Sequence, residues 1–375
     1  MVRGADSLCP YAAAHIAESL PMTLALVLLA LALALGAFWL LRAGPAAPPA
    51  PAPLPLPAAT PPAPPAAPVE LPPRLPLHHA ELIDPLLTRP LMDALRQLRR
   101  PSPAVLRLMA PDFVQHASSA ELASVVVAEP AIAARVVAAA NAPLYGLQQP
   151  VTSIGQATTF LGLNSVRQLC LQHLLADGFQ PRDEAQQREF DRLWRASSIA
   201  GELCQQLAPP LRIAEPGMLV TLLVLSFLGR QAGAMLLPDV AGLDAMDAHQ
   251  RALHEQRELG LASHELGHLL MRAWELPAVL ADEARTLAAL RFDPTLALPP
   301  GRAAPLTLAA LCALLGERLA GGGTGTAPFY APAQDPAPDM AALRHRLAQP
   351  PLDALAQELH TPAMLRLLSR LSQRL

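Results

Sequence analysis

One short segment of the sequence has the residue types and spacing of a hydrolytic zinc site. His264, Glu265 and His268 occur in the order His-Glu-Leu-Gly-His. Residues four apart lie on the same face of a helix, so both imidazoles could bind one zinc ion while Glu265 acts as a general base. The segment therefore makes a zinc metallopeptidase one hypothesis for this chain.

The residues after this segment do not extend the zinc signature. The longer form of the motif needs Gly at position 271 and His at position 274, where this chain has Met271 and Trp274. A further acidic ligand about twenty residues on is also absent, because Glu275 and Glu283 are too near and Glu317 is too far. We therefore interpret the segment first as a partly solvated helix, with zinc peptidase as the alternative.

The composition excludes several other kinds of chemistry. All 28 basic residues are Arg, so there is no Lys for a Schiff base, a P-loop or a kinase-type site. The net charge is −3 and no basic stripe is present, so no nucleic-acid partner is expected. The four cysteines are widely spaced, as is typical of unpaired thiols in a reducing compartment. No catalytic residue and no cofactor is predicted from these features.

The elements that must position any site begin after a candidate membrane anchor. A short N-terminal segment, 1–21, precedes a predicted transmembrane helix at 22–42, and 20 residues of that helix carry no charge. At about 1.5 Å per residue, they match the thickness of a bilayer core. More Arg residues follow the helix than precede it, which favours a cytoplasmic C-terminal portion. A cleaved signal peptide remains the alternative.

A proline-rich linker is predicted next, over 43–77. From Pro45 to Pro76, 15 of 32 residues are proline and most of the others are alanine. Such a sequence does not form helix or sheet interiors and adopts extended polyproline structure. We expect a disordered spacer between the anchor and a folded portion.

The remaining sequence predicts an all-α fold, since no run alternates at a period of two residues. A lead-in helix is expected at 78–97, and a C-terminal helical extension at 291–375 with a flexible loop around 320–338. Ser118 with Glu121 and Ser153 with Gln156 are capping-box pairs. The other expected helices are Ala131–Ala142, Ser165–Ala176, Glu184–Leu207, Met218–Met235, Asp244–Glu258, Ala262–Trp274, Ala278–Ala289, Leu306–Leu319, Met340–Leu347 and Leu352–Leu375.

Several residues have a local structural interpretation. Pro130 is expected to open a helix, and Asn141 to satisfy loose backbone groups at the end of that helix. Gly162 is expected to stop a helix, with Asn164 as the cap of the next one. Trp274 is expected to be buried.

The middle of the chain resembles the HDOD domain, an all-helical bacterial signalling module distantly related to HD-type metal phosphohydrolases. The likeness spans 98–290 and depends on the order and spacing of short fragments. The matching residues are Pro103, Glu129, Pro130, Asn141, the run Ile154-Gly155-Gln156-Ala157, Leu161, Gly162, Trp194, Ser197, His264, Gly267 and the run Trp274-Glu275-Leu276-Pro277.

The resemblance also implies where a metal site would lie if the chain had one. Where relatives carry a His-Asp pair, this chain has Ser226 and Phe227, and Ala196 stands where a further His is expected. Methyl and phenyl groups cannot bind a metal ion. The resemblance thus implies a degenerate HD site with no metal ligands.

Taken together, these observations predict a non-enzymatic signal-transduction protein: an HDOD-like module anchored by one helix in a bacterial inner membrane, with its soluble portion in the cytoplasm. The resemblance implies that the module acts by protein–protein interaction with a partner of a signalling pathway. A small-molecule second messenger is conceivable, but the sequence does not identify one.

Overall fold

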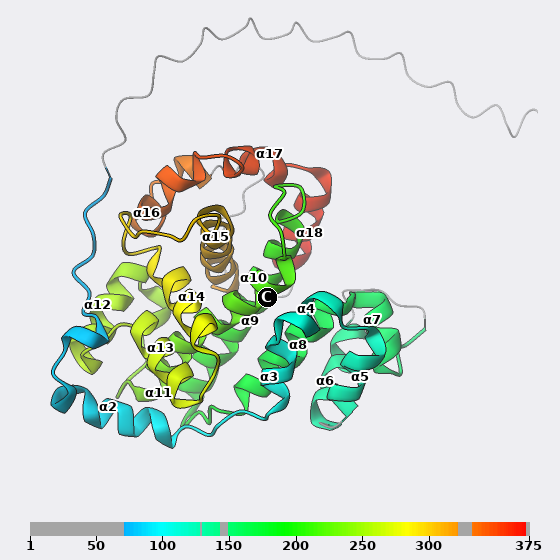
Figure 1. Cartoon of the computed structure of the whole chain (residues 1–375), viewed down its shortest axis with the longest axis horizontal. Helices are drawn as coiled ribbons and strands as arrows, with labels where there is room; N and C mark the ends of the chain where they lie inside the picture. The colour runs from blue at the N-terminus through cyan, green and yellow to red at the C-terminus, as the bar shows by residue number, and fades with distance from the viewer. Residues whose placement is uncertain (1–70, 128–129, 143–148, 322–331, 373–375) are drawn as a thin grey trace, which may run out of the picture. The chain divides into compact units, whose positions relative to one another are not determined.

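The computed structural model of the chain describes residues 71–127, 130–142, 149–321 and 332–372, and over these residues every regular element is helical (Figure 1). The all-α prediction is therefore confirmed for the described part. The predicted transmembrane helix at 22–42, and the linker up to residue 70, lie outside the described residues.

Apart from α2, which packs on α13, the first half of the domain is a group of short helices around the longer helix α8. Helices α5–α7 lie together in Figure 1, and α3 and α7 pack against α8. Arg167 of α8 is fully buried and donates hydrogen bonds to the carbonyl oxygens of Leu108 and Gly217, so it joins α3 and α10 to α8. The helices are α2 Pro85–Gln97, α3 Ala104–Met109, α4 Pro111–His116, α5 Ser119–Val127, α6 Pro130–Ala140, α7 Ile154–Leu161 and α8 Leu163–Ala176.

Helix α9 is the central element, and α10 and α15 lie along it (Figure 1). The α9–α15 contact is close because Gly316 has no side chain: a β-carbon there would lie 2.4 Å from the carbonyl oxygen of Ala196. Cys204 and Cys312 are buried free thiols of this interface. Burial and contact with Cys204 raise the pKa of Cys312. The helices are α9 Glu184–Leu207, α10 Pro216–Ser226 and α15 Ala303–Ala320.

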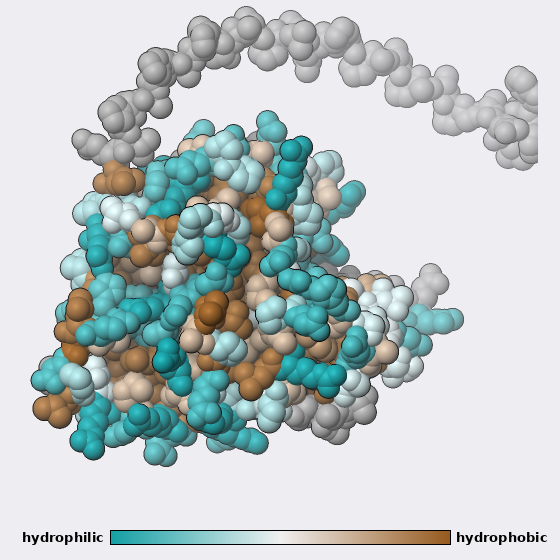
Figure 2. All heavy atoms as spheres, viewed as in Figure 1, coloured by the Kyte–Doolittle hydropathy of each residue, from teal (hydrophilic) through white to brown (hydrophobic). Residues whose placement is uncertain are grey.

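Helices α11–α14 form a second group, on the opposite side of α9 and α10 from α5–α7 (Figure 1). A C-terminal group, α16–α18, packs against α15 through α16 and α18. On the face shown in Figure 2, hydrophilic side chains separate apolar ones into small patches. The remaining helices are α11 Leu228–Leu236, α12 Ala248–Leu259, α13 Ser263–Ala273, α14 Ala278–Ala289, α16 Pro338–Leu347, α17 Leu355–Leu359 and α18 Pro362–Ser372, with 3₁₀ turns η1 Ala80–Leu82, η3 Leu243–Ala245, η4 Pro332–Gln334 and η5 Leu352–Ala354.

Two described stretches have the length and hydropathy of a membrane span, Pro216–Leu236 and Ala303–Ala320. Their apolar windows are 83% and 72% buried inside the domain. Length and composition alone do not separate such helices from core helices, and their burial is typical of a core.

Most predicted helices are present, and three differ in an informative way. The expected helix Met218–Met235 is interrupted at Phe227, between α10 and α11. The expected helix Leu352–Leu375 breaks before Pro362, because proline has no N–H to continue the hydrogen-bond ladder. The lead-in helix begins only at Pro85, after an N-cap hydrogen bond of 2.8 Å from the Leu86 N–H to Asp84 Oδ1.

The capping predictions have mixed outcomes. Ser118 and Glu121 form a reciprocal capping box, with N···O distances of 2.7 and 3.2 Å. Asn141 behaves as expected, since its amide bonds the carbonyl oxygens of both Val137 and Val151. Asn164, however, does not cap a helix. Gly162 is the N-cap of α8, and Asn164 Oδ1 is buried without a partner.

The last residues of the predicted linker belong to the folded body. We call residues 71–83 the strap. Its Leu75 N–H bonds the carbonyl oxygen of Phe292 at 3.0 Å, and Leu77 is buried. Gln256 of α12 also donates to the carbonyl oxygen of Pro76 at 3.1 Å. The linker prediction therefore ends too late, because Leu75, Leu77 and nearby backbone groups find partners on the domain.

Candidate functional site

The two histidines of the candidate zinc segment have different neighbours. Both lie on α13 and both are buried. His264 Nε2 lies 3.6 Å from Glu265 Oε1, and the imidazole ring lies 5.7 Å from the ring of Phe292. His268 Nε2 instead lies 2.9 Å from Asp282 Oδ1 on α14. The structure thus joins His264 and Glu265 to one another, but assigns His268 to another partner.

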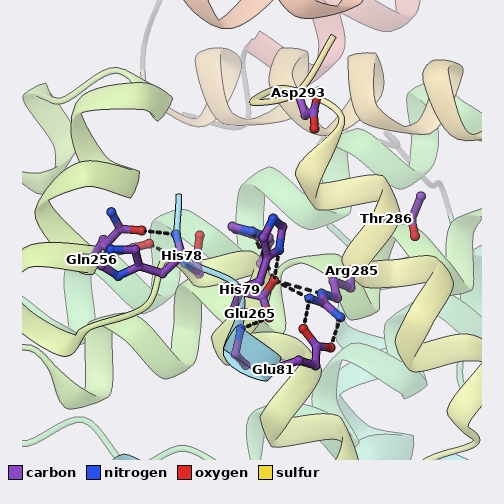
Figure 3. A network of polar contacts seen from close by, with 12 residues as sticks. His78, His79, Glu81, Gln256, Glu265, Arg285, Thr286 and Asp293 are labelled. Carbon is purple, nitrogen blue, oxygen red and sulfur yellow. Dashed lines mark hydrogen bonds and ion pairs between the residues drawn. The ribbon is translucent and has the colours of Figure 1, made fainter. Parts of the chain in front are cut away.

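Glu265 is a fully buried carboxylate whose oxygens already accept several hydrogen bonds (Figure 3). Arg285 donates to its Oε1 from Nε at 3.0 Å and from Nη2 at 2.6 Å. The strap contributes the Ala80 N–H at 3.2 Å and His79 Nδ1 at 3.2 Å. Because these donors occupy the carboxylate, Glu265 is placed to hold the strap and not to activate a water molecule.

Arg285 extends this network to a second carboxylate on the strap, as Figure 3 shows. Its two terminal nitrogens bond the oxygens of Glu81 at 2.6 and 2.9 Å, which is a bidentate pair. These hydrogen bonds lower the pKa of Glu81 to about 2. One guanidinium therefore links α14, α13 and the strap.

Three side chains of this network also have the spacing of a metal site. His79, His264 and Glu265 place one ligand atom each within 4.8 Å of the others, and no other such group of three occurs among the described residues. The donor set does not fit a zinc peptidase centre, because the cationic Arg285 binds the only carboxylate of the three at 2.6 Å. Burial lowers the pKa of His264 to about 4, so this imidazole is neutral.

The glycine of the zinc-like segment has a packing role. Gly267 of α13 crosses Gly229 of α11, and a β-carbon on Gly267 would lie 2.9 Å from the Gly229 nitrogen. A β-carbon on Gly229 would lie only 1.8 Å from the carbonyl oxygen of Ser263. The His-Glu-Leu-Gly-His segment is thus explained by a helix crossing and a strap contact.

Ser226 and Phe227 lie at the junction of α10 and α11, where the resemblance implies a lost His-Asp pair. Ser226 Oγ donates to the carbonyl oxygen of Leu223 at 2.7 Å, and the Phe227 ring is buried. The cavity that both residues line is only 20 Å³. A void of about 10–15 Å³ is the least that holds one water molecule, so this one has no room for a substrate.

Charged side chains of the chain itself surround this void. Glu317 of α15 pairs with Arg230 at 2.5 Å and with Arg291 at 2.8 Å. Burial raises the pKa of Glu317, but the two guanidiniums outweigh it and lower the value to about 2. Burial lowers the pKa of Arg230 to about 10, which still leaves it cationic. Two guanidiniums and one carboxylate therefore stand beside Ser226 and Phe227.

Sequence reasoning missed this triad of Arg230, Arg291 and Glu317. A usable signal was present, because Arg230 interrupts an otherwise uncharged stretch from 216 to 238. A charge in such a stretch is rarely buried without a partner. Which partner it has depends on α15, and sequence spacing does not indicate that contact.

The remaining position implied by the resemblance, Ala196, is closed by packing. It is fully buried on the face of α9 that α15 covers, next to the crossing at Gly316. No imidazole or carboxylate comes from this position.

Comparisons with known proteins agree with this architecture. A Geobacter sulfurreducens HDOD domain protein of unknown function is similar at 19% identity, covering 77% of this chain and 97% of its own, with a TM-score of 0.54. A Shewanella amazonensis protein named for a proposed phosphohydrolase activity is also 19% identical, covering 76% and 97%, with a TM-score of 0.51.

A Marinobacter aquaeolei protein named for a proposed role in signal transduction is 19% identical, covering 77% of this chain and 64% of its own, with a TM-score of 0.51. None of the curated proteins matches the chain. These similarities show a shared fold. The family comparison is more specific, since the HDOD domain matches residues 101–288, and the chain therefore belongs to the HDOD family.

Proposed function

We propose that this chain is a non-catalytic regulatory HDOD protein that acts by binding another protein. The observation that carries the proposal is the 20 Å³ void at Ser226 and Phe227 with the triad beside it. A metal phosphohydrolase needs ligands for a cation and room for both water and a phosphoester. A cation at this place would face two guanidiniums and only one carboxylate.

The metal content and hydrolytic activity of the purified full-length chain test this proposal. We expect less than one equivalent of any transition metal by mass spectrometry. We also expect no hydrolysis of bis-p-nitrophenyl phosphate with added Mn²⁺, Mg²⁺ or Zn²⁺. One bound equivalent of metal together with phosphoester hydrolysis would refute the proposal.

The zinc peptidase hypothesis has one observation in its favour, the grouping of His79, His264 and Glu265. It requires zinc bound in stoichiometric amount and cleavage of an unfolded protein such as casein. A Glu265→Gln variant would abolish that cleavage, whereas His268→Asn would leave a centre made with His79 intact. We expect neither bound zinc nor cleavage, because Arg285 occupies the carboxylate.

We also propose that residues 22–42 anchor the chain in a bacterial inner membrane, with the HDOD region in the cytoplasm. The uncharged N-terminal stretch supports the anchor, and the buried free thiols Cys170, Cys204 and Cys312 suit a reducing compartment. Reporter fusions at the C-terminus test the orientation. Activity of a reporter that works only outside the cytoplasm would refute it.

Partner binding is tested by cross-linking in cells of the source organism. The full chain is compared there with a chain that lacks residues 101–288. We expect a protein that is recovered only with the full chain. Identical recoveries from both chains would contradict a role for the HDOD region.

A further inference from the structure

A cavity of 690 Å³ opens between α8 and α9, and none of its lining residues borders the small void at Ser226. Its size lies within the range of about 300–1,000 Å³ that is typical of small-molecule sites. Along α9, Asp191, Trp194, Arg195 and Ser198 recur at helical spacing and line the cavity. The cavity therefore lies on a different face of α9 from the one at which Ala196 contacts α15.

Three guanidiniums from three different elements line this cavity. Arg99 comes from the connection between α2 and α3, Arg135 from α6 and Arg195 from α9. Within the described residues, neither Arg99 nor Arg195 has a hydrogen bond or an ion pair from its side chain. Asp177 and Asp191 also line the cavity, so the cations outnumber the carboxylates by three to two.

The third guanidinium bonds a neutral base instead of an acid. Arg135 Nη1 lies 3.1 Å from His173 Nδ1. Arginine can only donate, so Nδ1 accepts and the ring proton is on Nε2. Burial and the charge of Arg135 lower the pKa of His173 to about 4. His173 therefore neither neutralises Arg135 nor adds a charge at neutral pH, and its Nε2–H is a further donor.

Aromatic side chains form another part of the lining. Phe179 and Phe190 are buried against each other with their ring centroids 5.5 Å apart, and Trp274 supports Phe179 at 5.6 Å. Trp194 is only partly buried, so part of its indole remains accessible at the cavity. A planar aromatic ring can stack on such a side chain.

We propose that this cavity binds a nucleotide, that is, a phosphorylated ligand with a planar aromatic base. Arginine guanidiniums match the geometry of phosphate oxygens and bind them in bidentate fashion. Trp194 offers a stacking surface, and the cavity is far larger than a lone phosphate needs. This proposal goes beyond the proposed function, because it supplies the regulatory module with a soluble ligand.

Calorimetric titration of the full-length chain tests the proposal. The probes are GMP, ADP, cyclic di-GMP, inorganic phosphate and a phosphoserine peptide. We expect at least one nucleotide to bind with a stoichiometry of one. Inorganic phosphate should bind at least about tenfold more weakly, since it lacks the stacking contact.

Three variants locate the site. Arg195→Gln and Arg99→Gln each remove a guanidinium that has no partner among the described side chains, so we expect both to melt like the parent. Each should weaken nucleotide binding about tenfold or more, the effect of one lost charge-assisted hydrogen bond. Arg257→Gln, an exposed arginine of α12 outside the cavity, makes the same charge change and should leave binding unaltered.

Three results would overturn the proposal. They are the absence of nucleotide binding, equal binding by the Arg195→Gln and Arg257→Gln variants, and binding of phosphate or the phosphopeptide as tight as that of any nucleotide. None of them alters the metal and phosphoester measurements, so the proposed function stands or fails separately.

Discussion

Replacing Gly229 by alanine tests whether the close crossing of α11 and α13 explains the glycine of the zinc-like segment. The new β-carbon would lie 1.8 Å from the carbonyl oxygen of Ser263, whereas ordinary contact begins at 3.4 Å. Helices α11 and α13 would therefore have to separate by about 1.6 Å, the difference between these two distances. The obstacle is backbone, so no side-chain rotation relieves it.

The size of the effect follows from two opposing terms. Overpacking of this kind costs about 3 kcal/mol, at the upper end of the usual range, because the helices must move apart. Alanine regains about 1 kcal/mol of helix propensity over glycine. We expect a net loss of about 2 kcal/mol or more in the free energy of unfolding, and a melting temperature lower by roughly 4–8 °C.

Thermal denaturation followed by circular dichroism measures this loss. Gly155→Ala is the matched control, because a β-carbon at this exposed position of α7 has only the Ser153 hydroxyl nearby, at 4.0 Å. The control should melt at or above the parent temperature. A Gly229→Ala variant that melts with the control would refute the close crossing of α11 and α13.

A double variant checks the reasoning independently. Gly267→Ala adds a methyl group to the same crossing, 2.9 Å from the Gly229 nitrogen. Once one methyl group has separated the helices, the second costs less, so the double variant should lose less stability than the sum of the single losses. Additive losses would mean that the two glycines do not share one contact.

Three further outcomes are expected. Glu317→Gln should cost about 3–5 kcal/mol at neutral pH, since it leaves buried guanidiniums without their carboxylate. The pKa of Glu317 is about 2 in the folded chain against an ordinary 4.5, so its contribution is complete above pH 4.5 and is lost as the pH falls towards 2; the variant's denaturation curves should lack this acid loss. Glu265→Gln should loosen the strap, and limited trypsin digestion should then cut after Arg74, whereas unchanged digestion would contradict the strap contacts. In a Cys9→Ser background, the three described thiols should react with a thiol reagent only on unfolding, because all three are buried; reaction of the native chain would contradict that burial.

Much of the fold follows from local sequence signals. The limits of Glu184–Leu207 and Ala278–Ala289 agree with the structure to the residue, since each has a clear start and a regular apolar face. The Ser118 capping box forms for the same reason. Asn164 shows the limit of such signals. Its sequence position suits a cap, but Gly162 already supplies the turn, with φ of 85°, and α8 begins at Leu163, two residues before the predicted start.

The candidate sites depend on contacts that local patterns do not encode. The Glu265 network needs the strap beside α13, and the triad needs α15 beside α11, although these partners are far apart in the chain. The zinc-like spacing was real as a sequence pattern. It did not predict that Arg285 would occupy the carboxylate, because arginine reaches it from a separate helix.

Helix α9 takes part in both a close helix contact and the 690 Å³ cavity, through different faces. At Ala196 its backbone contacts α15 so closely that only glycine fits at position 316, so changes there must preserve packing. Trp194 and Arg195, adjacent in the chain, instead border an open cavity, and both side chains are only partly buried. The face of α9 at Ala196 therefore maintains the packing with α15, whereas the face at Arg195 can vary without unfolding the domain. We therefore expect substitutions at Arg195 to alter ligand binding without changing the melting temperature. Substitutions at Gly316 should lower the melting temperature and leave ligand binding by the folded chain unchanged.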